Sequence, residues 1–441
     1  MLRNVVLKQK NEKEHLLSLS YVERTKSRQA GKWLDSDLIK VVLGPRRAGK
    51  SVFALTLLHG RPFMYVNFDD EWLFRQDQFH YDDLMKELHV AYGPVKTVLF
   101  DEIQNVPAWE LWINRLHREG YNIVMTGSNA NLLSRELASA LTGRHMPIEI
   151  LPFDFREFLR AKDFTWSPER AALPEAKAAL LTWMDQYLIS GGFPEVVVKG
   201  VDPHGYLSVL FDSVLFKDVV RRHKVRYSEE IGQLGSYVMS NVSNLHSFRK
   251  LTQVLHFRSG VTLEKYLRYL TEAYLVFLLR RYSAKAGERP DQRLRRPKCR
   301  EPRERLTSPQ KAYAVDNGFV SAKAVQHSPD QGRLMENLVF VELVKRGWEP
   351  NRGLFYYKTR NDREVDFALR RATAMTELIQ VAYQTQDEAI ERREIKALLE
   401  ASDELGTPTL TVLTWDEARE VRRDGKTFHF TPLWHWLMQS P

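Results

Sequence analysis

The sequence predicts an α/β protein in three parts, and three observations carry this prediction. A β-branched apolar run at residues 39–43 is followed by a glycine-rich turn and an amphipathic helix, as at the edge of a buried parallel sheet. From about residue 206 the pattern is helical, and at residue 312 strands and helices begin to alternate again. With 441 residues, the chain exceeds what one hydrophobic core usually supports, so two or three domains are expected.

Composition narrows the class of protein only moderately. Lys and Arg number 65 against 56 Asp and Glu, and the resulting charge of +9 suits an anionic partner such as nucleic acid without requiring one. Cys299 is the single cysteine, which excludes an internal disulfide or a cysteine-based zinc site and favours a reducing compartment. No apolar run is long enough to span a bilayer, and residues 1–15 turn charged before a secretory segment develops. We therefore expect a soluble, cytoplasmic protein without a membrane partner.

The glycine-rich turn has the spacing of a phosphate-binding loop. Its residues are Gly44, Pro45, Arg46, Arg47, Ala48, Gly49, Lys50 and Ser51. Gly44 and Gly49 let backbone N–H groups face phosphates, and the following helix N-terminus adds partial positive charge. Lys50 is expected to reach the β- and γ-phosphates, and the Ser51 hydroxyl to bind Mg²⁺. The expected cofactors are therefore ATP and Mg²⁺.

Residues 96–104 contain a further apolar strand, which delivers two successive carboxylates at its end, Asp101 and Glu102. About fifty residues beyond a phosphate-binding loop, this is the Walker B arrangement. Asp101 is then expected to order Mg²⁺, and Glu102 to polarise the attacking water.

A third strand, residues 121–126, leads into Ser128 and Asn129. A polar residue at the tip of the strand beside Walker B can hydrogen-bond the γ-phosphate or the attacking water, and Asn129 is the first candidate for this role. Both residues are also good N-caps for a helix over residues 132–141, so helix capping stays open as the alternative.

Four stretches together, GPRRAGKS, VLFDEIQ, TGSNANLLSRELASALTGR and PFDFREFL, resemble a specific group of proteins. The group consists of prokaryotic AAA-like (AAA+ type) ATP-binding proteins with a restriction-endonuclease-like C-terminal domain of unknown function. Further similar stretches lie at residues 187–195, 314–318, 336–340 and 364–367, so the resemblance covers nearly the whole chain. It implies an ATPase core, a winged-helix middle and a degraded nuclease fold, without defining a physiological task.

Arg144 stands directly before the expected fifth strand, residues 145–150. The resemblance places there the arginine finger that enters the nucleotide site of a neighbouring subunit, with Arg135 as second candidate, and so implies a homo-oligomer. The alternative is a surface arginine paired with a carboxylate.

In the middle of the chain, residues 176–189 are expected to form a helical lid over the nucleotide. Residues 246–255 and 262–274 read as a helix–turn–helix, followed by a wing strand at 275–282. Its second helix offers Lys265, Arg268 and Tyr269 for contacts to nucleic acid, although winged helices also serve as packing modules.

Residues 286–311 are rich in Arg, Lys and Pro, which predicts a linker or a long exposed loop. Such a segment can contact a phosphate backbone or act only as a solvated hinge, and both interpretations stay open.

The C-terminal part resembles metal-dependent nucleases of the PD-(D/E)XK type. The expected elements are a helix at 333–346, strands at 354–359, 364–369 and 376–383, a helix at 387–400 and a strand at 409–414. Glu336 and Asp366 fit the metal-binding pattern, whereas Gln380 replaces the next carboxylate and Ala382 the lysine. Lys396 or Arg393 could act as a migrated substitute. We expect a retired nuclease site.

The expected domains are an AAA-like P-loop ATPase domain at 1–160, a helical lid and winged-helix domain at 161–285, a basic linker at 286–311 and a restriction-endonuclease-like domain at 312–441. The expected function is ATP binding with Mg²⁺-dependent hydrolysis, in a molecular switch or machine acting on nucleic acid. The alternatives are a nucleotide-gated scaffold for a protein partner and an ATP-regulated nuclease.

Overall fold

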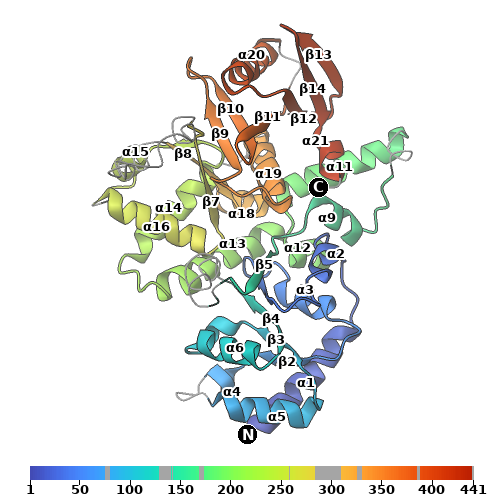
Figure 1. Ribbon diagram of the computed structural model, residues 1–441. Coiled ribbons are helices and arrows are strands. Elements are labelled where there is room, and N and C mark those ends of the chain that lie inside the picture. Colours follow the sequence, from blue (N-terminus) through green and yellow to red (C-terminus); the bar gives the residue numbers. More distant parts are fainter. Residues whose placement is uncertain are drawn as a thin grey trace, which may run out of the picture.

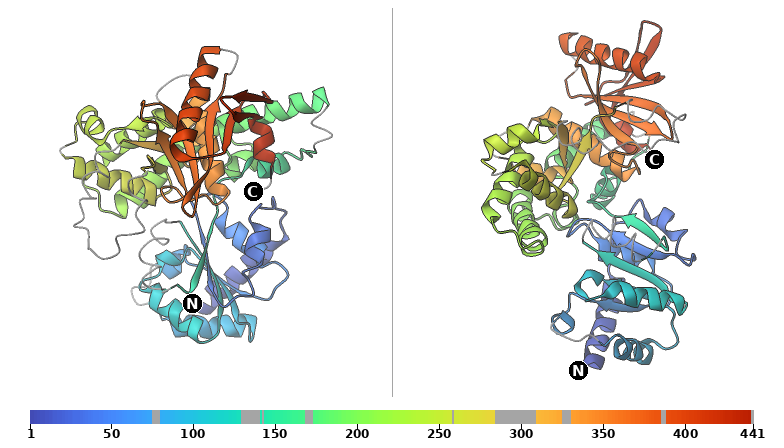
Figure 2. Two further views of the ribbon diagram at one scale, coloured as in Figure 1. Left: turned by 45° about the horizontal axis from the view of Figure 1, so that its top comes forward. Right: turned by 60° about the vertical axis from the view of Figure 1, so that its left-hand side comes forward.

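The computed structural model describes residues 1–74, 80–128, 141, 143–167, 173–257, 259–283, 309–324, 330–384 and 388–439. It contains an N-terminal α/β domain, a largely helical middle and a second α/β domain at the opposite end (Figures 1 and 2). This confirms the predicted multidomain α/β fold class. None of the helices in the described ranges is long and apolar enough to cross a lipid bilayer.

The N-terminal domain is built on a five-stranded parallel sheet in the order β2-β3-β4-β1-β5. Its strands are β1 (Ile39–Leu43), β2 (Met64–Asn67), β3 (Thr97–Asp101), β4 (Asn122–Gly127) and β5 (His145–Glu149). β1 and β3 both run parallel to β4, which lies between them. The loops that follow β1 and β3 therefore lie at the same end of the sheet, the carboxyl-terminal end of its strands. This topology brings the glycine-rich turn close to the Asp-Glu pair.

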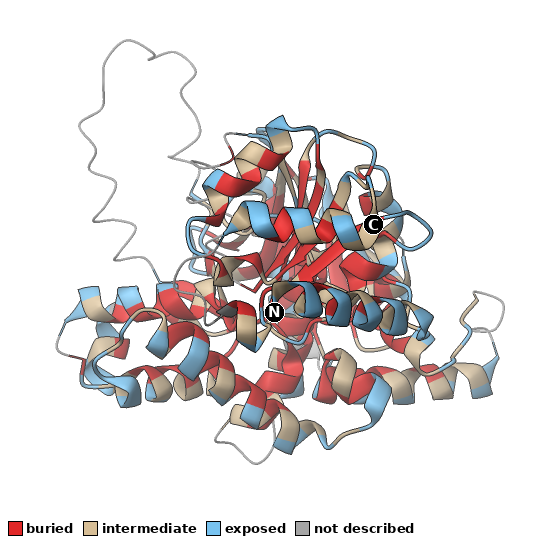
Figure 3. Cartoon of the chain, turned by 90° about the horizontal axis from the view of Figure 1, so that it is seen from below, coloured by how far each residue is buried: buried red, intermediate tan, exposed pale blue. Residues whose placement is uncertain are grey.

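Helices cover both faces of this sheet. They are α1 (Leu2–Ser18), α2 (Ser27–Gly31), α3 (Lys50–Leu57), α5 (Tyr81–Tyr92) and α6 (Trp109–Arg118), with the short segments α4 (Glu71–Phe74) and η1 (Ile103–Asn105). Successive side chains of β1 point to opposite faces of the sheet. Val41 and Leu43 pack with α5 and α6 on one face, whereas Val42 packs with α2 and α3 on the other. Figure 3 shows the strands buried and the outer helical faces exposed.

The middle of the chain is mainly helical. Its helices are α9 (Phe155–Ala161), α11 (Pro174–Ser190), α12 (Pro194–Lys199), α13 (Pro203–Val214), the π-helical segment η2 (Leu215–Arg221), α14 (Ser228–Ser240), α15 (Phe248–Val254) and α16 (Gly260–Glu272). The strands β6 (Leu245–His246), β7 (Val276–Arg280) and β8 (Gln310–Ala314) form a small antiparallel sheet in the order β6-β8-β7. The helix expected from residue 246 starts two residues later because residues 245 and 246 pair with β8.

The boundary expected at residue 312 falls inside β8, which pairs with both β6 and β7. Residues 310 and 311 belong to β8, so the predicted linker leads from β7 to β8 within one sheet; its residues 286–308 lie outside the described residues. One continuous hydrophobic core also joins the middle helices to the C-terminal sheet. The predicted boundary fails because β8 is not a surface linker: all five of its residues are buried between the middle helices and the C-terminal domain.

The C-terminal domain has a six-stranded mixed sheet in the order β13-β14-β12-β11-β10-β9. Its strands are β9 (Leu354–Lys358), β10 (Glu364–Arg371), β11 (Ala374–Ala382), β12 (Thr409–Thr414), β13 (Arg419–Arg423) and β14 (Lys426–Pro432). Its helices are α18 (Asn317–Lys323), α19 (Gln331–Lys345), α20 (Glu388–Leu405) and α21 (Leu433–Met438). The β13–β14 hairpin and α21 lie beyond the elements that the sequence predicted.

The helix expected as a nucleotide lid, residues 176–189, is α11, and it packs against α9, α18, α19 and α21 (Figure 1). Its apolar side chains Leu180, Met184 and Leu188 enter the core shared with the C-terminal domain. This packing places α11 beside that domain, whereas α12 and η2 approach the glycine-rich turn.

Candidate functional site

Residues 44–51, from here on the P-loop, have a backbone that depends on two glycines. Gly44 has φ +145°, and a Cβ atom there would lie 2.0 Å from the carbonyl oxygen of Ile150. Gly49 caps α3 with φ +88°, in the left-handed region. Any side chain at either position would strain the turn, so both glycines are needed for this shape.

Lys50 is buried at the N-terminus of α3, and its Nζ donates a hydrogen bond of 2.9 Å to the backbone oxygen of Pro45. Burial lowers the pKa of Lys50 more than the nearby carboxylates of Glu102 and Asp101 raise it. The ammonium group is thus held within the loop by a backbone carbonyl, which phosphate oxygens can replace.

Asp101 lies directly beside the P-loop helix. Its carboxylate accepts hydrogen bonds from Ser51 Oγ at 2.8 Å and from Thr126 Oγ1 at 2.5 Å. Burial raises the pKa of Asp101 to about 6, against the hydrogen bond from Thr126, which lowers it. Hydroxyl and carboxylate oxygens are the hard ligands that Mg²⁺ prefers, so Ser51 and Asp101 fit the metal that the motif implies.

Glu102 follows in a left-handed backbone conformation, with φ +53°. Its N–H donates to Thr126 Oγ1 at 3.0 Å, and its carboxylate accepts a hydrogen bond from Gln104 Nε2. A non-glycine residue in this conformation is held there by its surroundings, as is common at functional sites. Sequence reasoning missed Thr126, although its place one residue before the end of β4 is a usable signal.

The remaining predicted residues have different outcomes. Asn129 and Arg135 lie outside the described residues, whereas Ser128 is buried and its hydroxyl has no hydrogen-bond partner within the described part of the chain. Arg144 is exposed before β5, where its backbone oxygen accepts from Ile39 N–H. Arg144 therefore lies at the amino-terminal end of the sheet strands, whereas the P-loop follows the carboxyl-terminal end of β1. The five residues of β5 separate these two ends by roughly 16 Å. Arg144 is thus distant from the P-loop of its own chain.

Both arginines of the P-loop are engaged by carboxylates from the middle of the chain. Arg46 forms two hydrogen bonds with buried Asp218 in η2, at 2.5 and 3.1 Å. Arg47 lies 3.1 Å from Glu195 in the first turn of α12. Sequence reasoning missed these partners because they are 172 and 148 residues away along the chain.

Arg24 supports the P-loop backbone through a hydrogen bond. Its guanidinium donates to the backbone oxygen of Ala48 at 2.9 Å and to that of Leu151 at 2.5 Å, and it forms an ion pair with Glu157 at 3.0 Å. Arg24 is therefore a buried arginine that supports the P-loop from the N-terminal segment of the chain.

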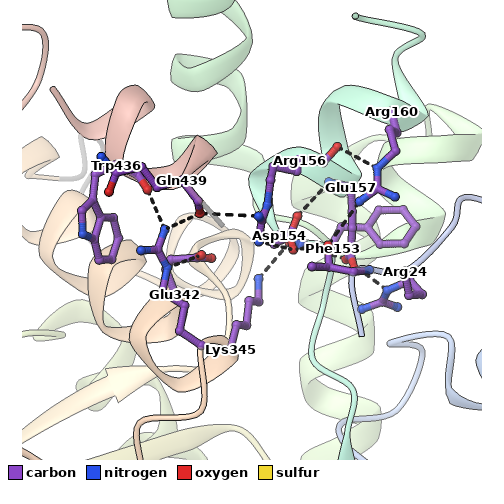
Figure 4. A network of polar contacts seen from close by, with 12 residues as sticks. Arg24, Phe153, Asp154, Arg156, Glu157, Arg160, Glu342, Lys345, Trp436 and Gln439 are labelled. Carbon is purple, nitrogen blue, oxygen red and sulfur yellow. Dashed lines mark hydrogen bonds and ion pairs between the residues drawn. The ribbon is translucent and has the colours of Figure 1, made fainter. Parts of the chain in front are cut away.

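Polar contacts continue from this point to the C-terminal domain (Figure 4). Lys345 Nζ donates to the backbone oxygen of Phe153 at 2.9 Å, and Arg346 forms an ion pair with Glu342 at 2.8 Å. Arg346 also donates to the backbone oxygen of Trp436 in α21 at 2.6 Å. The N-terminal domain, α19 and α21 are therefore tied together by charge-assisted hydrogen bonds.

In the C-terminal domain, Glu336 and Asp366 lie together as predicted, but Lys311 of β8 lies between them. Its Nζ is 2.8 Å from Glu336 and 2.9 Å from Asp366. Gln380 accepts a hydrogen bond from the Asp366 N–H through its side-chain oxygen. No group of His, Cys, Asp and Glu side chains among the described residues is arranged as a ready metal site.

The two residues suggested as migrated lysine substitutes are placed differently. Arg393 pairs with Glu394 at 2.6 Å, and Lys396 is exposed on α20. The lysine of the cluster instead comes from residue 311, at the end of the segment expected to be a linker. No local signal in that basic stretch distinguishes Lys311 from its neighbours.

The comparisons with known proteins agree with this arrangement. Residues 36–159 match the family described as AAA domain, and residues 181–330 and 331–436 match two domains of unknown function, DUF8612 and DUF4143. An uncharacterized protein of Methanocaldococcus jannaschii is 33% identical over 417 residues, which cover 91% of this chain and 88% of that protein. The chain belongs to this family of AAA-like ATP-binding proteins.

An uncharacterized protein of Haemophilus influenzae is 30% identical over 368 residues, covering 79% of this chain and 84% of that protein. Among solved structures, the Walker-type ATPase of Pyrococcus abyssi has a TM-score of 0.41 at 14% identity and covers 70% of this chain and 99% of that one. The Holliday junction branch migration motor RuvB of Thermotoga maritima has a TM-score of 0.29 at 13% identity, covering 62% and 97%. The family assignment rests on the sequence relatives.

Proposed function

We propose that the protein binds ATP together with Mg²⁺ at the P-loop and hydrolyses it. The main support is the convergence of Lys50, Ser51 and Asp101 at one sheet edge, with Ser51 Oγ 2.8 Å from the Asp101 carboxylate. Bound Mg²⁺ would supply positive charge against the β- and γ-phosphates, with Ser51 and Asp101 as its protein contacts.

The chain's own residues divide the remaining work. Lys50 exchanges the Pro45 carbonyl for phosphate oxygens and neutralises their charge. Glu102, held by its left-handed backbone and by Gln104, orients the attacking water and accepts its proton. Asn129, which follows β4 in the sequence, is proposed to hydrogen-bond the γ-phosphate or that water.

We further propose that ATP acts as a switch through the two P-loop arginines. Arg46 and Arg47 are engaged by Asp218 and Glu195. Phosphate oxygens carry the same charge as these carboxylates and compete for the same guanidinium groups. Nucleotide binding then releases or shifts η2 and α12, and this differential contact is what a ligand needs in order to move a conformational equilibrium.

Arg144 supports a proposed homo-oligomer. Because it is exposed and lies at the sheet edge away from its own P-loop, its catalytic role requires a neighbouring subunit. Arg144→Ala subunits are expected to bind ATP without hydrolysing it, and mixing them with Lys50→Ala subunits restores part of the turnover. A fully active monomer contradicts this role.

A basic cleft supports nucleic acid as the partner. We propose that α14 to α16 and β6 to β8 form a winged helix, whose α16 lines a cleft of about 1750 Å³ facing the N-terminal domain. Lys265 and Arg268 of α16 lie on one wall, and Lys32 lies on the other. Phosphate groups placed between these walls would release counterions from both. The alternative partner is a protein, for which the chain would act as a nucleotide-gated scaffold.

Phosphate release from ATP, with Mg²⁺ or with EDTA, tests the proposed function. Wild type should turn over ATP only with Mg²⁺, and Lys50→Ala should lose ATP binding. Turnover is then compared with and without single-stranded DNA, duplex DNA and RNA. Stimulation that disappears in a Lys265→Ala/Arg268→Ala variant supports the nucleic acid proposal; a response to none of them favours the protein scaffold. Absence of Mg²⁺-dependent turnover under every condition rejects the ATPase proposal.

A further inference from the structure

Three carboxylates in the C-terminal domain converge on one ammonium group. Lys311 Nζ lies 2.8 Å from Glu336 Oε1, 2.7 Å from Glu364 Oε1 and 2.9 Å from Asp366 Oδ1. The carboxylates come from α19 and β10, whereas the lysine comes from β8. A lysine ammonium has three N–H donors; here it donates hydrogen bonds to Glu336 and Asp366 and forms an ion pair with Glu364.

The surrounding structure fixes the cluster in this form. Lys311 is 1% exposed and is paired in register with Leu245 of β6 and Leu279 of β7. The carboxylates have anchors of their own: Tyr313 OH donates to Glu336 at 2.7 Å, and the Val381 N–H donates to Asp366 at 3.0 Å. The carboxylate positions therefore do not depend on the lysine alone.

The electrostatic balance keeps Lys311 charged. Burial by itself lowers the pKa of Lys311, but Asp366 and Glu336 raise it well above its ordinary value. Several carboxylate oxygens from separate segments around one buried cation are also the usual surroundings of a divalent metal ion. In this protein the cation at their centre is covalently part of the chain.

We propose that Lys311 is a built-in substitute for a divalent metal ion. The ammonium group occupies the point on which Glu336, Glu364 and Asp366 converge, so the domain keeps a metal-type carboxylate cluster and needs no metal. Mg²⁺ or Mn²⁺ cannot enter unless Lys311 is displaced. This inference is independent of the ATPase proposal, because the P-loop takes no part in it.

Manganese binding by the full chain without nucleotide tests the inference. Mn²⁺ is the probe; binding is followed by electron paramagnetic resonance and stability by the thermal unfolding temperature, Tm. Wild type and the matched buried-lysine control Lys50→Met should show no Mn²⁺-dependent rise in Tm. Lys311→Met should have a lowered Tm in EDTA that rises by several degrees with Mn²⁺. Adding Asp366→Asn to Lys311→Met should abolish that rise.

The wild-type measurement decides the matter even if Lys311→Met does not fold. Mn²⁺ binding to wild type that is lost in Asp366→Asn would show that a metal coexists with Lys311, and would overturn the proposal. A Lys311→Met/Glu336→Gln variant carries one unpaired carboxylate fewer and provides a second folded protein for the same titration. Failure of both Lys311 variants to bind Mn²⁺, or to fold better with it, also overturns the proposal.

Discussion

Lys50 at the P-loop and Lys311 in the C-terminal domain are both buried near carboxylates, and their environments are opposite. Lys50 Nζ donates to a backbone carbonyl, and burial lowers its pKa. Lys311 Nζ contacts three carboxylates, and the negative charge of Asp366 and Glu336 raises its pKa against the effect of burial.

The difference shows how placement decides the role of one residue type. A lysine that is to meet the charge of a ligand must be desolvated but left without a carboxylate partner, because a prior ion pair would compete with the ligand. A lysine that replaces a cation inside the fold needs the reverse. We therefore expect Lys50 to matter for ligand binding and Lys311 for stability.

The largest expected effect lies on the catalytic side of this comparison. Glu102→Gln should keep ATP affinity and reduce turnover by about 10²- to 10⁴-fold, the range for loss of a general base. The measurements are ATP binding by calorimetry and phosphate release at saturating ATP. Equal turnover in wild type and variant would refute the assignment of Glu102.

The next largest effect concerns stability, and it compares the removal of Lys311 with the removal of Lys50. Lys311→Met should lower the free energy of unfolding by about 3–5 kcal/mol, because three buried carboxylates lose their counterion. Lys50→Met should leave it unchanged or raise it slightly, since the unliganded protein then no longer buries an ammonium that forms no ion pair with the described carboxylates. Urea unfolding of the two variants in EDTA measures the contrast. Equal losses of stability would remove the distinction between the two lysines.

A pH dependence follows from Asp101, whose pKa burial raises to about 6. The protonated carboxyl cannot bind Mg²⁺, so affinity for Mg²⁺ with ATP should be constant at pH 7 to 8 and fall by up to about tenfold per pH unit below 6. Asp101→Asn should bind more weakly and lack this step. Without ligand the sign for stability is the reverse: a carboxyl pKa raised on folding adds stability that is lost as pH rises from about 4 to 6.

The smallest expected effect concerns the P-loop arginines. Asp218→Asn should raise ATP affinity roughly fivefold, which corresponds to ~1 kcal/mol for a partly exposed ion pair, because phosphate no longer competes with a carboxylate for Arg46. Glu195→Gln is the matched control: Arg47 is 64% exposed, so little change is expected. Weaker ATP binding in Asp218→Asn would instead mean that Asp218 positions Arg46 for the nucleotide.

The elements closest to the chemistry were predictable because their signals are local. A strand, a glycine-rich turn and a helix lie within residues 39–57, and Asp101, the first residue of the Asp-Glu pair, ends one short strand. Backbone geometry and hydrophobic alternation act over a few residues, so the sequence predicts them directly. The strands at 354–358 and 409–414 were predicted for the same reason.

What the sequence determined by itself was the class of protein: an AAA-like ATP-binding chain with a P-loop that only glycine permits at residues 44 and 49. Only the tertiary structure decided which distant side chains complete each site. Asp218 reaches Arg46 across 172 residues, and Lys311 reaches Asp366 across 55. Such approaches arise from the packing of whole elements into a common core, and no local pattern along the chain records which charged residue that packing will bury.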